Sequence, residues 1–445
     1  MKLNKSVKSV PSVPVFTHEG GPAKKVTPLL ELRRSILATM LWEDGFYESG
    51  IAVAQRVANL VKSVKPEKVA ALAIEARGKG KLRHIPLLIA RTMAPLPTHR
   101  EYVADLLNAI IQRPDELAEF LSIYWKDKKQ PLSAQVKKGL AKAFTKFDEY
   151  QLAKYNRDSA IKLRDVLFLC HAKPIDKKQE KLWKRLINDE LKTPDTWEVA
   201  LSATEGENKK EAWERLLTEG KLGGLALLRN LRNFKQTGVS ESLVRKALKD
   251  MKTERVLPYR FITASKYAPN LEPELEEAMY KAIEGKGEKI KGKTVLLLDV
   301  SGSMDAKISD KSEATRLDAA EGLAILAREM FEDVEIFSFS NRTVQIPSRR
   351  GFALRDAIHT SQSHGGTALG AAIEHVASLP YKRLIVFTDE QAADKVKDPR
   401  KGAEGYMVNV ANNQYGVGYG AWNHIDGFSE SILDYIVEFE RLAAE

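Results

Sequence analysis

The sequence predicts an α + α/β fold, in which an all-helical part precedes a doubly wound α/β domain. Two patterns carry this prediction. From residue 28 to residue 284, apolar residues recur at helical spacing in short segments separated by Pro, Gly or polar breaks. From residue 294 onward, apolar runs of strand type alternate with helical segments, which is typical of a parallel sheet covered on both faces.

Length and composition favour a multidomain cytoplasmic protein. A chain of 445 residues exceeds the size at which one core stops growing, and 43% of its residues are hydrophobic. The single cysteine, Cys170, excludes an intramolecular disulfide and is typical of a reducing compartment. No apolar run of about 18 residues occurs, so we expect no membrane span and no secretory signal.

The charge is distributed unevenly along the chain. Residues 291–445 contain 17 Lys and Arg against 23 Asp and Glu, a net −6, whereas residues 1–290 carry +16. A basic region of this kind favours a polyanionic partner, because Lys and Arg that neutralise phosphates release condensed counterions. A solvated, lysine-rich surface is the alternative.

The helical part is expected to stack short amphipathic helices. In "LLELRRSILATMLWE", Leu29, Leu32, Ile36 and Met40 share one face. Such helices bury their apolar stripes against neighbours, which predicts irregular HEAT-like stacking, an α-solenoid. The Gly- and Lys-rich stretch "EGKGEKIKGK" marks the end of this part. We therefore predict a flexible lead-in over 1–24, a helical-repeat domain over 25–286 and an α/β domain over 287–445.

In the α/β domain, we predict strands at 294–300, 334–340, 383–389 and 406–411. Helices are predicted at 316–331, 367–378 and 429–443. Ligands bind such sheets beyond the carboxyl ends of the strands, where loops from separate strands converge.

Five oxygen-bearing residues are predicted to meet at that edge. Asp299, Ser301 and Ser303 end the run "TVLLLDVSGSMD", Thr367 lies in "SHGGTALG", and Asp389 ends the strand-like "IVFTDEQ". Hard oxygen ligands suit an octahedral ion, so we expect Mg²⁺, with Mn²⁺ as the alternative. The two carboxylates compensate the charge, Asp389 directly or through water. The three hydroxyls are neutral and leave the metal electrophilic.

Each of these residues also has a simpler interpretation. The serines could cap a helix or form a turn, and Asp389 could be an ordinary acid at a strand end. A serine hydrolase is disfavoured, because "VSGSM" departs from Gly-x-Ser-x-Gly.

The five positions, in their order, resemble the metal-ion-dependent adhesion site of von Willebrand factor A domains. Nearly the whole chain after about residue 25 resembles the TROVE module and attached A domain of the Ro autoantigen family, including its bacterial members. The motifs that carry this resemblance are "MLWEDGFYESG", "ARGKGKLRHIPLLIAR", "KLRDVLFLCHAKP", "GLALLRNLRNF", "RVLPYRFITA" and "IDGFSESILDYI".

This resemblance implies a monomeric ring in which HEAT-like helices form a toroid that the A domain helps to close. It also implies that Y RNA binds the outer surface, and that ends of misfolded or structured RNAs bind near the central hole. The family's Y RNA contact falls in "LAKYNRDSAIKLRDVLFLCHAKP", where Lys154 and His171 match by position. Arg157 lies one place from a family arginine position, which Asp158 occupies here.

The residues of this segment support the same interpretation independently. Lys154, Arg157, Lys162 and Arg164 are close in sequence to aromatic residues on which bases could stack. In "RNLRNF", Arg229 and Arg232 at i, i+3 are predicted to share one helix face and to line the hole, with a solvated face as the alternative.

We therefore expect a noncoding-RNA-binding ribonucleoprotein that acts in RNA quality control and has no catalysis of its own. Y RNA would tether it to an exoribonuclease such as polynucleotide phosphorylase. One alternative is a helical scaffold whose A domain binds protein carboxylates through the metal, without RNA. A metal-dependent nuclease is the other, but two carboxylates provide no second metal and no evident general base.

Overall fold

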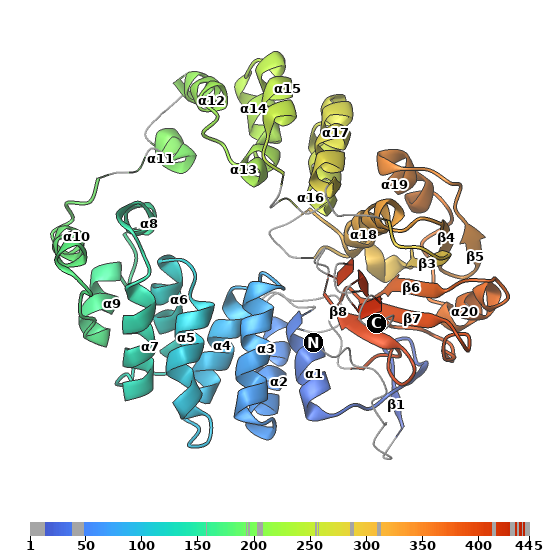
Figure 1. Ribbon diagram of the computed structural model, residues 1–445, viewed down its shortest axis with the longest axis horizontal. Coiled ribbons are helices and arrows are strands. Elements are labelled where there is room, and N and C mark those ends of the chain that lie inside the picture. Colours follow the sequence, from blue (N-terminus) through green and yellow to red (C-terminus); the bar gives the residue numbers. More distant parts are fainter. Residues whose placement is uncertain are drawn as a thin grey trace. The chain divides into compact units, whose positions relative to one another are not determined.

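The computed structural model of this chain describes residues 14–37, 49–156, 158–192, 194, 196–202, 208–253, 256, 258–284, 289–308, 313–411 and 415–427, together with 432, 433, 436, 437, 439 and 440. The chain divides into two compact units (Figure 1). The helical unit comprises residues 50–203. The sheet unit joins the N-terminal segment to residues 204–445.

The helical unit stacks its helices in two rows, as the apolar spacing predicts. α2, α4, α6 and α9 contact one another in sequence along one row, and α3, α5 and α7 do so along the other. The bounds are α2 Gly50–Ser63, α3 Pro66–Gly78, α4 His84–Met93, α5 Val103–Ile110, α6 Asp115–Tyr124, α7 Ala134–Phe144, α8 Glu149–Tyr155, α9 Leu163–Cys170, α10 Lys177–Ile187 and α11 Trp197–Ser202. This pairing confirms the predicted HEAT-like stacking.

Local sequence explains both the helix starts and the close packing in this unit. The Ser133 hydroxyl accepts a hydrogen bond from Val136 N and caps α7. Gly139 lets α7 approach α5, since a Cβ there would lie 2.9 Å from the Ala104 carbonyl oxygen.

A buried ion pair at 2.6 Å joins Arg77 of α3 to Glu116 of α6. Cys170 is a buried free thiol.

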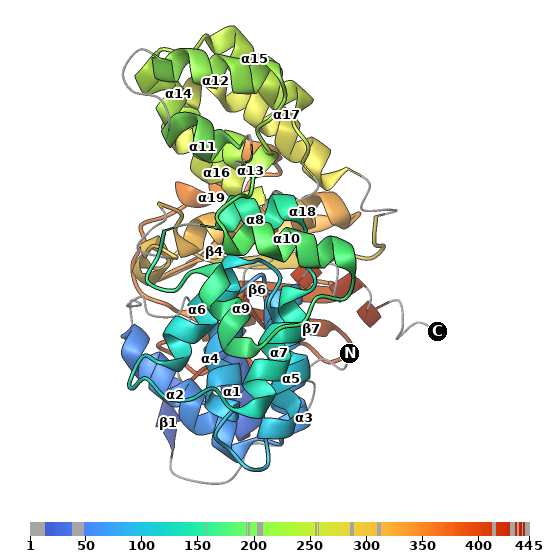
Figure 2. The same ribbon diagram turned by 90° about the vertical axis from the view of Figure 1, so that its left-hand side faces the viewer.

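The sheet unit begins with a second set of helices. These are α12 Asn208–Thr218, α13 Gly224–Arg229, α14 Leu231–Thr237, α15 Glu241–Asp250, α16 Pro258–Tyr267 and α17 Glu272–Ile283. α16 packs on α18, Arg316–Met330, where Gly322 meets the backbone of Tyr259. Lys266 of α16 pairs with Asp318 of α18 at 2.8 Å across this contact. The ribbons of both helices are labelled in Figure 2. α16 is therefore fixed to α18 by packing and charge.

Among the described residues, the sheet has six strands in the order β5-β4-β3-β6-β7-β8. Their bounds are β3 Thr294–Asp299, β4 Val334–Phe339, β5 Thr343–Gln345, β6 Arg383–Thr388, β7 Glu404–Asn409 and β8 Asn423–Asp426. All pairs are parallel except β4 with β5. The four predicted strands are confirmed. The edge strands β5 and β8 were not predicted, because three or four residues are too short to show a strand pattern.

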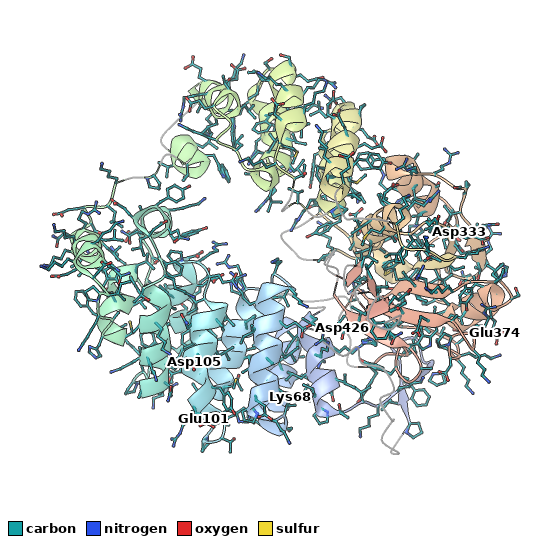
Figure 3. All side chains as sticks on the ribbon, in the orientation of Figure 1. Lys68, Glu101, Asp105, Asp333, Glu374 and Asp426 are labelled. Atoms are coloured by element: carbon teal, nitrogen blue, oxygen red, sulfur yellow. The ribbon has the colours of Figure 1, made fainter. Side chains whose placement is uncertain are left out.

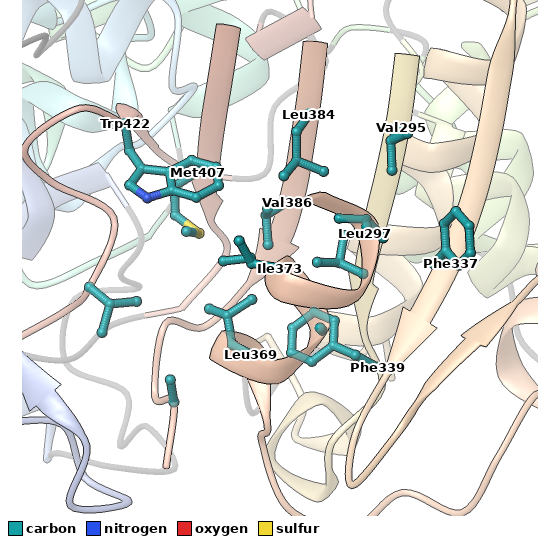
Figure 4. Packing of buried hydrophobic residues seen from close by; sticks show 14 of the residues in the cluster. Val295, Leu297, Phe337, Phe339, Leu369, Ile373, Leu384, Val386, Met407 and Trp422 are labelled. Carbon is teal, nitrogen blue, oxygen red and sulfur yellow. The ribbon is translucent and has the colours of Figure 1, made fainter. Parts of the chain in front are cut away.

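Both faces of the central strands are buried, as a doubly wound sheet requires. Every residue of β3 is buried, and side chains alternate between the two faces. On one face Val295 and Leu297 pack with Leu384, Val386 and the residues of α20, Leu369–Ala377 (Figure 4). α18 also contacts β3. The predicted α/β class is confirmed.

The N-terminal segment differs from its prediction. Residues 14–24, expected in a flexible lead-in, include β1, Val15–Phe16, paired with β2, Pro22–Ala23. α1, Pro28–Leu37, contacts β8 and was expected to join the helical stack. Residues 1–13 and Met40 lie outside the described residues. The contact between α1 and β8 joins segments at opposite ends of the sequence, so it has no local signature.

Two further predictions fall partly on residues that are not described. The boundary at 286/287 lies among them and stays a prediction. Of the predicted helix 429–443, residues 432, 433, 436, 437, 439 and 440 are described, and all are helical. A search of the described helices finds none that is long and apolar enough to cross a membrane.

The core of the sheet predicts a clear stability difference between two single substitutions. Leu297→Ala removes a fully buried side chain and should lower the free energy of unfolding by about 2–5 kcal/mol. Ile74→Ala, on the exposed face of α3, should change it by less than about 0.5 kcal/mol. Scanning calorimetry measures both, and equal melting temperatures would contradict this packing.

Candidate functional site

The predicted metal ligands gather where two adjacent parallel strands end. β3 ends at Asp299 and β6 ends one residue before Asp389, and the two strands are paired directly. After Asp299 the chain enters a 3-10 helix, Gly302–Asp305, which carries Ser303. Because parallel neighbours end at the same edge, the pairing itself brings the two carboxylates together.

Hydrogen bonds link four of the five predicted ligands. Ser301 N donates to Asp299 Oδ1 at 2.9 Å, and the Ser301 and Ser303 hydroxyls are 3.2 Å apart. The Ser303 hydroxyl donates to Asp389 Oδ2 at 2.6 Å. Thr388, which sequence reasoning missed, donates its hydroxyl to Asp299 Oδ2 at 2.6 Å. The predicted convergence is therefore present for Asp299, Ser301, Ser303 and Asp389.

Thr367 lies in a loop held against the same edge. The Gly365 carbonyl accepts from Gly302 N at 3.0 Å, and the Thr367 carbonyl accepts from Ala393 N at 3.0 Å. The loop that contains Thr367 is thereby joined by backbone hydrogen bonds to Gly302, beside the serines, and to Ala393, near Asp389. Thr367 itself is almost fully buried.

The two carboxylates at this edge are buried side by side. Asp299 and Asp389 are both fully buried. Burial, and after it the repulsion of Asp389, raises the pKa of Asp299 to about 7. Arg316 Nη1 lies 3.4 Å from Asp389 Oδ2. Sequence reasoning missed Arg316, which follows the N-cap Thr315 of α18.

This donor set fits a hard divalent cation. Two carboxylates and three hydroxyl groups are the ligands that Mg²⁺ and Mn²⁺ accept, and excess negative charge favours a cation. Among all the described residues, those at this edge included, no group of three or more His, Cys, Asp or Glu could hold a metal ion. A metal at this edge therefore depends on the hydroxyl groups. Beside it, His364 Nδ1 lies 2.8 Å from Asp305 Oδ1, a pair that the sequence did not indicate.

The described residues of the predicted Y RNA contact lie in and beside α8 and α9 of the helical unit. Lys154 lies in α8, with Nζ 5.9 Å from the Tyr155 ring centroid. His171 is exposed and ends α9 in the left-handed conformation, φ 53°. Its Nε2 lies 3.4 Å from Nζ of Lys137, a residue that was not predicted to contact RNA. Arg157 lies outside the described residues.

Two of the other predicted cations have carboxylate partners. Lys162 pairs with Asp158 at 2.8 Å, and Arg164 pairs with Asp189 at 2.7 Å. Such partners reduce the positive charge that each offers to a phosphate. The sequence could not show the second pair, because Asp189 is 25 residues from Arg164.

Arg229 and Arg232 do not share a helix. α13 ends at Arg229, α14 starts at Leu231, and the intervening Asn230 has φ −105° and ψ 4°. The Asn230 side-chain Nδ2 donates to the Ala226 carbonyl at 2.8 Å, competing with the helical backbone hydrogen bond. Both arginines are exposed, and Arg232 lies 5.8 Å from the Tyr267 ring centroid. The prediction of one continuous helix face is wrong.

Comparisons with known proteins agree with this architecture. Residues 29–189 and 184–320 match the TROVE domain family. The crystal structure of the Deinococcus radiodurans RO (RSR) protein matches with a TM-score of 0.56 and 20% identity, covering 91% of this chain and 97% of that one. This likeness shows that the two chains share a fold.

Two curated relatives named telomerase protein component 1 match across 342 residues. The protein of Rattus norvegicus is 25% identical and that of Mus musculus 26% identical, over 57% of this chain. This chain spans 13% of the length of each. Since the family match covers well over half of the 445 residues, the chain belongs to the TROVE-domain family of RNA-binding proteins, that of the Ro autoantigens.

Proposed function

We propose that this protein binds noncoding RNA as a Ro-type ribonucleoprotein in RNA quality control. Its RNAs are Y RNA and misfolded or structured RNA with single-stranded ends. The observation that carries the proposal is the end of α9, where His171 lies beside Lys137. Phe168, 57% exposed, and Ile175, 72% exposed, are its sequence neighbours. Cations next to exposed aromatic side chains are the combination that binds phosphates and stacks unpaired bases.

The remaining parts of the proposal rest on family membership. The protein works as a monomeric ring in the cytoplasm, and Y RNA tethers it to an exoribonuclease such as polynucleotide phosphorylase. It binds RNA and leaves cleavage to that partner. Crosslinking to cellular RNA followed by sequencing is the direct test. Enrichment of small structured RNA is expected, and its absence would favour the scaffold that binds protein carboxylates.

The sheet edge is proposed to hold Mg²⁺, with Mn²⁺ as a substitute, in a von Willebrand factor A type site. Asp299 and Asp389 would supply the negative charge. Ser301, Ser303 and Thr367 would supply neutral oxygens. A metal held in this way offers an electrophilic position to a carboxylate or phosphate oxygen from outside.

The RNA proposal predicts that Lys154→Ala combined with His171→Asn weakens binding of a Y-like stem-loop by about tenfold. The slope of log affinity against log salt should fall by about 1, because a phosphate contact is lost. Asn replaces His171 because it tolerates the left-handed conformation, so stability should be preserved. Filter binding at several salt concentrations measures the effect.

Lys142→Ala is the matched control, because Lys142 already pairs at 2.7 Å with Asp105, labelled in Figure 3. Its effect should be small. A misfolded RNA with a single-stranded 3′ tail should lose less affinity in the double variant, and more in Arg229→Ala combined with Arg232→Ala. Equal losses of both RNAs in both variants would contradict two separate surfaces.

The metal proposal predicts that Asp299→Asn and Thr367→Val each abolish specific binding of Mg²⁺ and Mn²⁺ in calorimetric titration. Metal-free Asp299→Asn should melt no lower than the wild type, because it removes one of two buried like charges. Thr315→Ala, which removes the cap of α18, should cost about 1 kcal/mol of stability and keep metal binding. Unchanged affinity in both ligand variants would eliminate the metal site.

The purified protein is also expected to leave labelled structured RNA uncleaved in the presence of Mg²⁺. The reason is that Asp299 and Asp389, the two carboxylates of the proposed metal site, provide no second metal and no evident general base. Cleavage that survives repurification and disappears in Asp299→Asn would establish the nuclease instead.

A further inference from the structure

We propose that the N-terminal strap, residues 14–37, positions the metal site, so that Thr17, Gly21 and Arg34 set its metal affinity without touching the ion. The strap acts on the metal loop, residues 389–394. This inference rests on the proposed metal site. It assigns a role to a segment that the sequence predicts to be partly a flexible lead-in.

The metal loop has contacts on both sides. On the metal side, Asp389 accepts from the Ser303 hydroxyl and Ala393 N donates to the Thr367 carbonyl. The loop therefore touches both halves of the ligand set. Any shift of its backbone would move Asp389 relative to Thr367.

The opposite side of the loop is held by the start of the strap. The Thr17 hydroxyl donates to the Ala392 carbonyl at 2.7 Å, and His18 N donates to Gln391 Oε1 at 2.7 Å. Gln391 N in turn donates to Asp389 Oδ1 at 3.2 Å. One residue of the loop thus joins the strap to the predicted metal ligand.

Gly21 shows how closely the two segments approach. A Cβ at Gly21 would lie 2.2 Å from the Ala392 carbonyl oxygen, a backbone atom that no side-chain rotation can move aside. A methyl group here must separate the strap from the metal loop. The glycine is therefore a steric requirement of this contact.

Arg34 of α1 pairs with Glu390, the residue of the loop that follows Asp389. Its Nη1 lies 2.8 Å from Glu390 Oε2, and both side chains are essentially fully buried. Glu390 has φ 61°, a left-handed conformation that is unusual for a residue with a side chain. Glu390 N donates to the Thr388 hydroxyl, which donates to Asp299. Arg34 thereby supports the backbone turn that links the two carboxylates.

His424 of β8 completes this contact. Its Nε2 lies 2.5 Å from Glu390 Oε1, and its ring stacks on Tyr419 at 4.2 Å between centroids. β8 ends at Asp426, labelled in Figure 3, and contacts α1. Removing a residue that holds a metal ligand in place without touching the ion typically lowers metal affinity by about 10–100-fold.

The test compares Mg²⁺ and Mn²⁺ affinity, by calorimetric titration of the full chain, in Thr17→Val, Gly21→Ala, Arg34→Met and Arg34→Lys. We expect affinity to fall about tenfold in Thr17→Val and Gly21→Ala and more in Arg34→Met, with partial recovery in Arg34→Lys. Melting curves report stability separately.

Two controls match these changes. Arg77→Met breaks the buried pair with Glu116, and Gly78→Ala adds a methyl group in open space. Arg77→Met should melt earlier than the wild type, and both should bind metal as the wild type does.

The outcomes separate the two proposals. A wild-type protein that binds neither ion removes the metal site itself. A wild type that binds, with unchanged affinity in Thr17→Val and Gly21→Ala, overturns the strap proposal even if Arg34→Met fails to fold. Reduced affinity at unchanged melting temperature in either of these two variants supports it, because a purely structural role would lower the melting temperature first.

Discussion

Asp299 and Asp389 are buried at the ends of neighbouring parallel strands, and the burial of two carboxylates side by side is the constraint on which the arrangement of the site depends. Removing charged groups from water costs several kcal/mol each unless partners compensate. The Thr388 and Ser303 hydroxyls donate to one carboxylate each, and Arg316 stands on the Asp389 side. Burial, and after it the repulsion of Asp389, raises the pKa of Asp299 to about 7. A divalent cation would stabilise both carboxylates as anions, and the oxygen atoms of this ligand set are the donors that such a cation accepts.

The turn after Asp389 adds a second constraint. A non-glycine residue in the left-handed conformation costs about 1–2 kcal/mol and persists where its surroundings over-determine it. At Glu390 those surroundings are the side chains of Arg34 and His424, which contact its carboxylate. Although burial alone would raise its pKa, Arg34 and His424 lower the pKa of Glu390 to about 2. A buried ion pair adds little net stability, but it favours one geometry for Glu390, the residue beside the proposed metal ligand Asp389.

Sequence reasoning reached the elements that have a local signature and missed those that depend on distant partners. Asp299, Ser301 and Ser303 follow a strand-like run, so their place at the sheet edge could be predicted. Long helices and central strands were also found from their periodicity. The short edge strands, the break at Asn230 and the carboxylate partner of Arg164 were missed, because each depends on one side chain or on a pairing across the fold. Arg34 and Glu390 are 356 positions apart, so nothing near either residue indicates the other.

The same long separation has a consequence for synthesis of the chain. The helical unit is essentially one continuous stretch, residues 50–203, and its contacts can form while the ribosome is still translating the rest. The N-terminal strap is made before the helical unit, whereas its partners at 389–394 and in β8 are made long after that unit. During translation it must therefore remain without these contacts for more than 350 residues. At about 5–20 residues per second this is a delay of tens of seconds, in which its apolar residues are candidates for chaperone binding.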